Sequence, residues 1–406
     1  MRRATALTIA ACVGIWVLAR WVVFDFFQLG DTRVYAHAAR MMDAGAIPYV
    51  DFDLEYPPLA TGLFWLVGQV PGGDYPLAFS MAMMVCLAAT ALAGLAIARR
   101  LGLGRVRTAT VIGVIALTPL ILGTLVQTRY DLVLSALLGW MAVAALHDRF
   151  GWAWTLLTLA IAVKLVPVLL IPVLVLWHLQ RRPGRGALIG VAGSAVGVAL
   201  TFAPFFAIAP TATWRLFAYH LDRPAEVESL GASIAQLVGL DYLRVQSYGS
   251  DNVTGAVADA FAALSTLLLA VAVAAVALWT WRALRRGPDD AGTVLVAALA
   301  ATLVASVLLG KVISPQYMVW LLPFVLVGAG RWGRVAIAAT VVAMALTQLV
   351  FPPLFSSLTE RGATLPVWLL FARNVLVVVV LIAVWPRCRR TTSRSGVRGG
   401  TPAVAR

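Results

Sequence analysis

Charged residues are scarce in this chain. Only 12% of its 406 residues are Asp, Glu, Lys or Arg, whereas 61% are hydrophobic. Soluble domains carry about 25% charged residues, so too few are present here to build a surface that faces water. Apolar stretches long enough to cross a bilayer recur along the whole length. The composition therefore excludes a soluble protein and predicts an all-α, polytopic integral membrane protein.

Cysteine is rare as well, and a nucleotide-binding loop is missing. The three cysteines, Cys12, Cys86 and Cys388, are dispersed and match no metal or redox spacing. The sequence has no Gly-rich phosphate loop, which argues against a soluble nucleotide-sugar domain. Asp51 and Asp53 have the Asp-x-Asp form of a metal-binding pair, but they lie in a loop close to the membrane. We therefore expect neither a metal nor another cofactor.

The basic residues are distributed as in a membrane protein, although a net charge of +14 could also indicate nucleic-acid binding. They cluster between apolar stretches at 99–107, 181–185, 282–286 and 331–334 and at both termini. Cytoplasmic loops have this pattern, so no nucleic-acid partner is expected. The opening Met1–Arg3 could also begin a signal peptide. The apolar run continues to about Trp21 without a small-residue cleavage site, which favours an uncleaved first transmembrane helix.

Placing these clusters on one side of the membrane sets the number of crossings. The apolar segments are 4–24, 58–70, 75–98, 108–124, 131–147, 152–179, 186–207, 255–282, 291–309, 315–329, 333–350 and 366–386. A crossing needs about 20 helical residues, so 58–70 is too short for an easy crossing, and whether it crosses stays open. If 152–179 is two short helices broken near Lys164, the chain makes about twelve crossings and both termini are cytoplasmic. Of the 18 acidic residues, three then fall on the cytoplasmic side: Asp148, Asp289 and Asp290.

The chain is expected to form one unit. We predict a single transmembrane domain at 1–386 and a disordered, basic cytoplasmic tail at 387–406, rich in Ser, Thr, Gly and Arg. Two large loops, 25–57 and 208–254, lie on the outer face in this scheme. In the first loop, apolar residues recur at helical spacing beside basic ones, which predicts a short amphipathic helix at the membrane interface. The apolar residues are Val34, Ala38, Met41 and Met42.

The two lysines are distinguished by their positions. Every other residue among the 32 Lys and Arg is an arginine, whereas Lys164 and Lys311 each precede a proline, Pro167 or Pro315, at an expected outer helix break. Such a lysine can snorkel or cap a helix. It can also present a compact point charge to an anionic group.

Further polar side chains gather on the same face. Together with the two lysines they form the expected substrate-binding set: Tyr35, Glu55, Tyr56, Arg129, Asp131, His220, Arg223, Glu228, Gln316 and Tyr317. Ionisable groups in or beside a membrane are costly, which makes each a candidate functional residue. Any one of them could instead be a solvated charge or part of a structural ion pair. As a set, acids and bases at a bilayer surface suit a substrate with a sugar, a phosphate and a lipid tail.

An ordered series of short motifs resembles glycosyltransferase family 87. The motifs are Asp31 to Tyr35, Gly45 to Tyr49, Glu55 to Leu59, Arg129 to Asp131, Lys164 to Pro167, Arg223 with Glu228 and Ser229, and Lys311 to Tyr317. The resemblance implies a GT-C fold and an α-mannosyltransferase that uses polyprenyl-phosphate-mannose. It also implies a glycolipid or glycan acceptor, contact with membrane lipids, and a plasma-membrane location with the active site on the extracytoplasmic face. The chain after Trp332 carries no matching motif.

The resemblance assigns roles to individual residues. Asp31 matches the catalytic aspartate, with Asp25 as its nearest competitor, and takes the acceptor proton in one inverting displacement. Cations would compensate the leaving phosphate; the candidates are Arg129, Lys164, His220, Arg223 and Lys311. Glu55 and Asp131 are expected to fix those cations or to bind sugar hydroxyls. Two other classes stay open: a transporter or flippase of lipid-linked sugars, and a non-catalytic scaffold or sensor.

Overall fold

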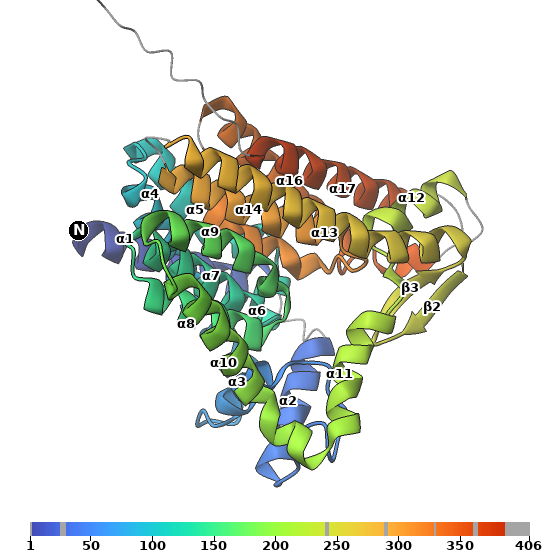
Figure 1. Cartoon of the computed structure of the whole chain (residues 1–406). Helices are drawn as coiled ribbons and strands as arrows, with labels where there is room; N and C mark the ends of the chain where they lie inside the picture. The colour runs from blue at the N-terminus through green and yellow to red at the C-terminus, as the bar shows by residue number, and fades with distance from the viewer. Residues whose placement is uncertain are drawn as a thin grey trace, which may run out of the picture.

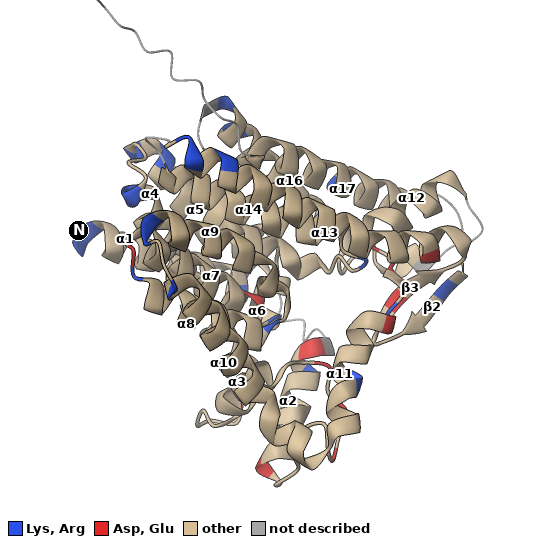
Figure 2. Ribbon diagram, viewed as in Figure 1, with Lys and Arg blue, Asp and Glu red and all other residues tan. Residues whose placement is uncertain are grey.

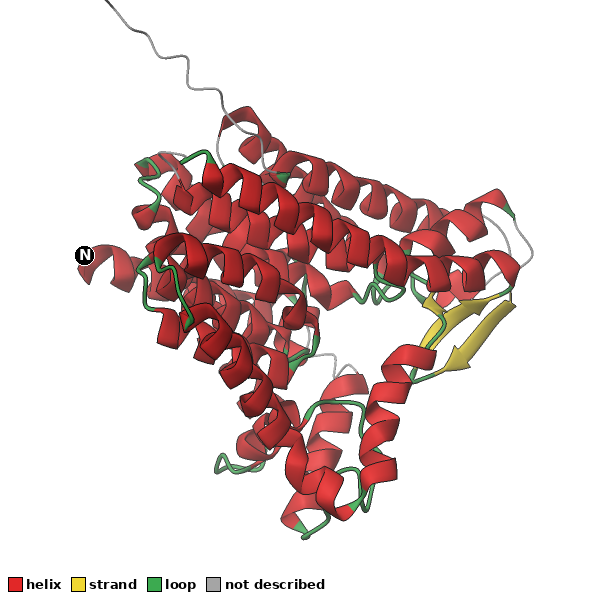
Figure 3. Ribbon diagram, viewed as in Figure 1, coloured by secondary structure: helices red, strands yellow, loops and turns green. Residues whose placement is uncertain are grey.

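The computed structural model describes residues 2–24, 30–239, 243–287, 291–328, 330–359 and 364–385. Helices dominate this part of the chain, and one small sheet lies at the edge of the molecule (Figure 3). Seven helices in the described residues are long and apolar enough to cross a bilayer. They are α1 (Arg2–Leu18) with its π-helical extension η1 (Ala19–Val23), α4 (Tyr75–Arg100), α10 (Gly186–Ile208), α13 (Ala256–Arg285), α14 (Ala291–Leu309), α16 (Gly330–Val350) and α17 (Leu365–Val384). The predicted multi-pass helical membrane protein is confirmed, whereas the count of about twelve crossings stays a prediction.

Shorter helices fill the space between the long ones. They are α2 (Gly30–Asp43), α3 (Pro58–Gly68), α5 (Arg105–Ile121), α6 (Leu125–Thr128), α7 (Asp131–Leu146), α8 (Phe150–Val163), η2 (Val166–Leu170), α9 (Ile171–Arg181), α11 (Pro210–Asp222), α12 (Leu230–Val238), η3 (Pro315–Leu321), α15 (Leu322–Val325) and η4 (Ser356–Thr359). The amphipathic helix expected in the first loop is α2. Its buried side carries Tyr35, Ala38 and Ala39, and its exposed side carries Val34.

The segment 152–179 is broken where the sequence predicts. Helix α8 ends at Val163, Lys164 has extended backbone angles (φ −156°, ψ 128°), and a 3-10 turn begins at Val166. Pro167 lacks a backbone N–H and disfavours helical geometry in the preceding residue, so the helix cannot run through this point. The break brings the lysine side chain out of the helix and toward the loops.

The segment 315–329 differs from the expected crossing helix. It is the 3-10 helix η3 followed by the single α-helical turn α15, with Pro315 and Pro323 near their starts. Both prolines remove a backbone donor, which favours short helical pieces over one long helix. The side chains of Met318 to Val327 are buried against other helices, so this piece lies inside the protein.

A small three-stranded antiparallel sheet, which the sequence did not predict, accompanies the helices. Strands β1 (Ala225–Glu226), β2 (Leu243–Ser247) and β3 (Ser250–Thr254) pair in the order β1-β3-β2. Ser247 pairs with Ser250 across a two-residue turn, in which Tyr248 and Gly249 both have positive φ (53° and 64°). Such turns match the twist of paired strands and favour glycine.

Charge separates along the molecule. Basic residues gather near the N-terminus and around the turn between α4 and α5, whereas acidic residues lie mainly around α2, α11 and β3 (Figure 2). We call the end with the α4–α5 turn the arginine face and the end with α2, α11 and the sheet the loop face. Helices α10 and α13 diverge toward the loop face, where α11 and the sheet lie between their far ends (Figure 1). The site described next lies at this end.

Candidate active site

One cavity of about 630 Å³ opens at the loop face. Pockets for small organic ligands have volumes of this order. Twelve of the thirteen residues predicted to form the site line it: Asp31, Tyr35, Glu55, Tyr56, Arg129, Lys164, His220, Arg223, Glu228, Lys311, Gln316 and Tyr317. Asp131 does not line the cavity and lies buried beside Lys164. Segments nearly 300 residues apart in the chain therefore meet around a single space.

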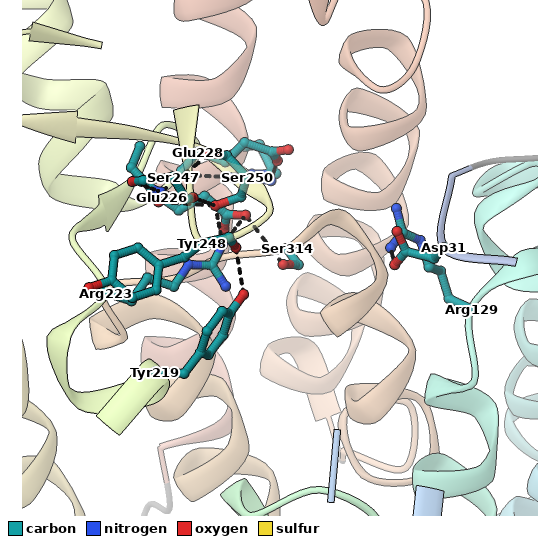
Figure 4. Close-up of polar contacts among 12 residues, drawn as sticks. Asp31, Arg129, Tyr219, Arg223, Glu226, Glu228, Ser247, Tyr248, Ser250 and Ser314 are labelled. Atoms are coloured by element: carbon teal, nitrogen blue, oxygen red, sulfur yellow. Dashed lines mark hydrogen bonds and ion pairs between the residues drawn. The ribbon is translucent and has the colours of Figure 1, made fainter. Parts of the chain in front are cut away.

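Asp31 and Arg129 form an ion pair on one wall of the cavity (Figure 4). Asp31 stands in the first turn of α2, and Arg129 lies between α6 and α7. The buried Thr32 hydroxyl donates to the Thr128 carbonyl at 3.2 Å, which holds the start of α2 against that turn. Tyr35, one helical turn after Asp31, places its hydroxyl 3.5 Å from Asp31 Oδ2. The carboxylate is thus oriented from two sides.

Aromatic rings pack behind this pair. Tyr35 stacks on Phe64 with ring centroids 4.1 Å apart, and Tyr56 meets Tyr35 edge-on at 5.4 Å. Tyr130 approaches both Tyr35 and Tyr56 edge-on. Tyr35 is almost fully buried, so it supports the cavity wall more than it reaches into the space. Such contacts rigidify the base on which Asp31 stands.

Lys164 is held inside the protein. Its Nζ donates to Asp131 Oδ1 at 2.7 Å, and Trp320 Nε1 donates to the same oxygen at 2.8 Å. The rings of Tyr130, Tyr317 and Trp320 surround the ammonium at 4.7–5.0 Å from their centroids. These distances allow cation–π attraction in addition to the ion pair. Lys164 is therefore compensated without a substrate, and this geometry favours a structural ion pair over a charge that is held for an anionic ligand.

A second polar group lines the cavity, apart from the Asp31–Arg129 pair in the view of Figure 4. Arg223 donates to Glu226 Oε1 at 3.2 Å and to Ser250 Oγ at 2.7 Å. Ser314 donates to the same Glu226 oxygen at 3.4 Å. Burial raises the pKa of the Glu226 carboxyl, and the Arg223 charge opposes that rise.

Lys311 lies next to that group and is attached to it through the backbone. Glu226 N–H donates to the Lys311 carbonyl at 2.8 Å. Lys311 Nζ donates to the Leu221 carbonyl at 2.6 Å, which caps the last turn of α11. In the described residues Arg129, Lys164 and Arg223 each have a carboxylate partner within 4 Å, but Lys311 has none. Among the lysines and arginines that line the cavity, Lys311 is thus the one in these residues that has no close carboxylate, and its charge can face an anionic ligand.

His220 lies on the last turn of α11 and borders the cavity. The side chain is exposed. The surrounding protein atoms and the Arg223 guanidinium nevertheless lower the pKa of the imidazole below its usual range. The imidazole is therefore neutral at pH 7. A neutral imidazole disfavours two roles for His220, as a cation that binds the phosphate and as an acid that protonates it.

Glu228 is engaged by the protein itself. Its Oε2 accepts from Arg373 Nη1 at 2.7 Å, and both side chains are buried. Burial raises the pKa of the Glu228 carboxyl, while Arg373 opposes the rise. Glu228 also lines the cavity, but its charge is already compensated.

Several polar atoms around the cavity lack a partner in the described residues. They are buried side-chain atoms of four lining residues: Arg129 Nε, Arg223 Nε, Glu226 Oε2 and Gln316 Oε1. Buried polar groups in native proteins are nearly always hydrogen-bonded to protein, water or ligand. These atoms can donate hydrogen bonds to, or accept them from, water or a polar ligand in the cavity.

The remaining candidates lie elsewhere or outside the description. Asp51 and Asp53 are exposed and do not line the cavity, and Asp51 Oδ2 accepts from the Ile47 N–H at 2.7 Å. Asp25 lies outside the described residues, as does the tail from residue 386. The prediction that no metal is needed thus stays a prediction.

The lining or supporting residues that sequence reasoning missed include Tyr219, Glu226, Ser250 and Arg373. A signal was present for Arg373, because an arginine within an apolar stretch long enough to span the membrane is a functional candidate by default. Glu226 stands two residues before Glu228, a predicted site residue, and is an ionisable group in the same loop. Tyr219 and Ser250 belong to a surface loop and a hairpin turn whose sequence has no distinctive pattern.

Comparison with known proteins agrees with this geometry. The sequence profile of glycosyltransferase family 87 matches residues 54–315, more than half of the chain. The polyprenol-phosphate-mannose-dependent alpha-(1-2)-phosphatidylinositol mannoside mannosyltransferase of Mycobacterium tuberculosis is 27% identical over 415 residues, which cover 93% of this chain and 88% of that one. The profile contains the cavity residues from Glu55 to Lys311, whereas Asp31 precedes it and α17 follows it.

Proposed function

Because the chain belongs to glycosyltransferase family 87, we propose that this membrane glycosyltransferase moves mannose from polyprenyl-phosphate-mannose to a hydroxyl group of an envelope glycolipid. The donor is proposed from the named relative, which depends on polyprenol-phosphate-mannose. The acceptor class follows from the same name, in which the acceptor is a phosphatidylinositol mannoside. The cavity supports the proposal because its lining combines an accessible carboxylate with a cation that lacks a carboxylate partner.

The observation that carries the proposal is the accessibility of Asp31. Its side chain is 27% exposed, whereas those of Glu226, Glu228 and Asp131 are 10%, 3% and 2% exposed. A general base must come within hydrogen-bonding distance of the proton that it removes. Of these four ion-paired carboxylates, Asp31 is the one that a substrate can reach.

The proposed step is a single displacement with inversion at the sugar. Asp31 accepts the proton of the acceptor hydroxyl while the hydroxyl oxygen forms a bond to the anomeric carbon of mannose. The bond from that carbon to the phosphate oxygen breaks, and the polyprenyl phosphate leaves with the electron pair. In the view of Figure 4 the Asp31–Arg129 pair lies apart from Arg223, Glu226 and Ser314. We call these three residues, with the neighbouring Lys311, the phosphate pole. A displacement from the side opposite to the leaving group would place the sugar between Asp31 and the phosphate pole.

Charge at the leaving phosphate would be compensated by Lys311. An ammonium has three N–H donors, and the Leu221 carbonyl uses one of them in this structure. The other two can bind phosphate oxygens, and fixed cations of this kind stabilise the charge that develops on a leaving group. Arg223 is a second donor but shares its charge with Glu226.

The apolar part of the lining suits the lipid tail of the donor. Val168 and Leu169 of η2 and Leu269 of α13 border the cavity on one side. Helices α10 and α13 are the least buried of the long helices, each with 11% of its most apolar window buried. Membrane lipid could therefore reach the site alongside α10 and α13, whose side chains are mostly exposed on the protein surface.

The proposed orientation places the loop face outside the cytoplasm. The arginine face would then face the cytoplasm, as the preference of Lys and Arg for cytoplasmic loops requires. Donor and acceptor would both be membrane-bound lipids that reach the cavity from the outer leaflet.

The test uses purified full-length protein in lipid nanodiscs with polyprenyl-phosphate-mannose carrying a radiolabelled sugar. Wild-type protein should transfer the label to a phosphatidylinositol mannoside acceptor. Asp31→Asn should insert normally and lower turnover by at least about 10²-fold, the lower end of a positioned base's contribution. Near-normal transfer by this variant would remove Asp31 from the mechanism and favour Glu55 or Asp25. Translocation of the donor across the bilayer without transfer would instead support a flippase.

A further inference from the structure

Arg373 of α17 binds the segment that carries the phosphate pole. All three of its guanidinium nitrogens donate: Nη1 to Glu228 Oε2 at 2.7 Å, Nη2 to the Glu228 carbonyl at 2.6 Å, and Nε to Asn374 Oδ1 at 3.2 Å. Asn374 Nδ2 in turn donates to the Glu228 carbonyl at 3.3 Å and to Ser233 Oγ at 3.0 Å. Both side chains are fully buried. One helical position thus fixes both the side chain and the backbone of Glu228.

We propose that Arg373, assisted by Asn374, is a positioning residue of the transfer site, which it sets through Glu228. The inference rests on the proposed function, because the site that it positions is the phosphate pole defined there. It extends the functional unit into α17, beyond the 54–315 segment matched by the family profile. Arg373 itself does not line the cavity, so it acts through another residue.

The path from Arg373 to the pole consists of short backbone links. Glu228 follows strand β1, in which Glu226 pairs with Asn252 of β3. The Val227 N–H donates to the Asp251 carbonyl at 3.0 Å, and the Glu226 N–H donates to the Lys311 carbonyl at 2.8 Å. A displacement of residue 228 would therefore move both Glu226 and the backbone of Lys311.

Stability alone is a weak reason for such a pair. Replacing a buried ion pair by apolar side chains of similar volume is often neutral or even stabilising, because two charges no longer have to be desolvated. α17 is otherwise apolar along LPVWLLFA and VLVVVVLIAV, so packing here does not call for charge. Two nitrogens of Arg373 bind Glu228 and the third binds Asn374, which itself donates to the Glu228 carbonyl. This arrangement gives geometric definition, which a fork of fixed donors provides better than a lysine ammonium.

The experiment compares wild type, Arg373→Lys and Arg373→Met in nanodiscs. Binding of polyprenyl phosphate, the bare product lipid, is measured together with the donor KM, kcat and thermal unfolding. Arg373→Lys keeps the charge but cannot reproduce the fork, so we expect a folded protein whose polyprenyl phosphate Kd and donor KM rise about tenfold, with a smaller change in kcat. Arg373→Met should show the same loss more strongly.

Arg181→Met is the matched control. It breaks the Arg181–Asp148 pair, whose arginine is 40% exposed and which lies far from the cavity on the arginine side of α9. Its Kd and KM should equal those of wild type. If Arg373→Met fails to fold, Arg373→Lys decides alone. A folded Arg373→Lys that unfolds at a lower temperature but binds polyprenyl phosphate and donor normally would overturn the positioning role and leave a structural one. Wild-type protein that neither binds polyprenyl phosphate nor transfers mannose would overturn the proposed function as well, so the two failures are distinguishable.

Discussion

Lys164 Nζ lies 2.7 Å from Asp131 Oδ1 and is surrounded by three aromatic rings. The two lysines of the chain therefore have different surroundings, although both follow a helix end and precede a proline. Lys164 has a buried carboxylate partner, and Lys311 has a carbonyl. This difference separates a structural cation from one that can bind substrate, and it leads to two predictions.

The first prediction concerns the buried pair. Lys164→Met should destabilise the protein by about 3–5 kcal/mol, because it leaves the Asp131 charge buried without its cation. The double variant Lys164→Met/Asp131→Leu removes both charges and should recover most of that loss. Thermal and denaturant unfolding in detergent micelles measures both. The exposed Arg181–Asp148 pair is the control, since Arg181→Met should change stability by only about 0–1 kcal/mol. Lys164→Met with normal stability and a raised donor KM would show instead that Lys164 binds the phosphate.

The second prediction compares Lys311 with His220, two of the candidate cations for the phosphate. Lys311→Ala should raise the donor KM about 10- to 100-fold, the range expected when a hydrogen bond to a charged group is lost. His220→Gln should change it by less than about threefold, because the lowered pKa keeps the imidazole neutral at pH 7. Initial rates against donor concentration, with acceptor saturating, measure both.

The direction of that pKa shift fixes the pH dependence. A histidine with a lowered pKa takes up its proton only below its ordinary value of about 6.5. Between pH 6.5 and 8 the donor KM should therefore show no titration that His220→Gln removes. A step in this range that is present in wild type and absent in His220→Gln would restore the cationic role of His220.

Local sequence signals predicted a large part of this site. The break at Lys164 follows from Pro167, and α2 follows from apolar residues at helical spacing; both are properties of a few neighbouring residues. Polar residues in an apolar chain predicted a shared substrate-binding face, because ionisable groups in or beside a membrane are costly. Their separate roles could not be predicted in the same way.

Pairing between distant segments accounts for what was missed. Whether Lys164 binds a substrate or Asp131 depends on which helix packs beside it. The spacing of residues in the sequence does not show which helices pack together. The same holds for Glu228, whose partner Arg373 lies 145 residues further along the chain. The sheet was not predicted because its strands are short and lie within a loop. β-propensity is weak evidence for a strand when no packed face accompanies it.

The third prediction is that transfer needs no divalent metal. A sugar joined to a lipid through one phosphodiester carries a single negative charge, which Lys311 with Arg223 can compensate. Asp51 and Asp53, the pair with a metal-binding pattern, lie away from the cavity lining. Activity should therefore persist in excess EDTA. Loss of activity in EDTA that Mg²⁺ or Mn²⁺ restores, together with the same loss in Asp51→Asn, would contradict this and return that pair to the mechanism.

The last prediction concerns the orientation of the protein in the membrane. Single cysteines at Leu221, 70% exposed on the loop face, and at Val106, 80% exposed on the arginine face, report on the two ends of the molecule. The native Cys12, Cys86 and Cys388 are first replaced so that only the reporter reacts. In intact cells a membrane-impermeant maleimide should label Leu221→Cys but not Val106→Cys, and permeabilised cells should label both. The reason is that the arginine clusters resist translocation, which holds their face in the cytoplasm. Labelling of Val106→Cys alone in intact cells would invert the topology and place the cavity on the cytoplasmic side, where the donor and acceptor lipids would have to be sought instead.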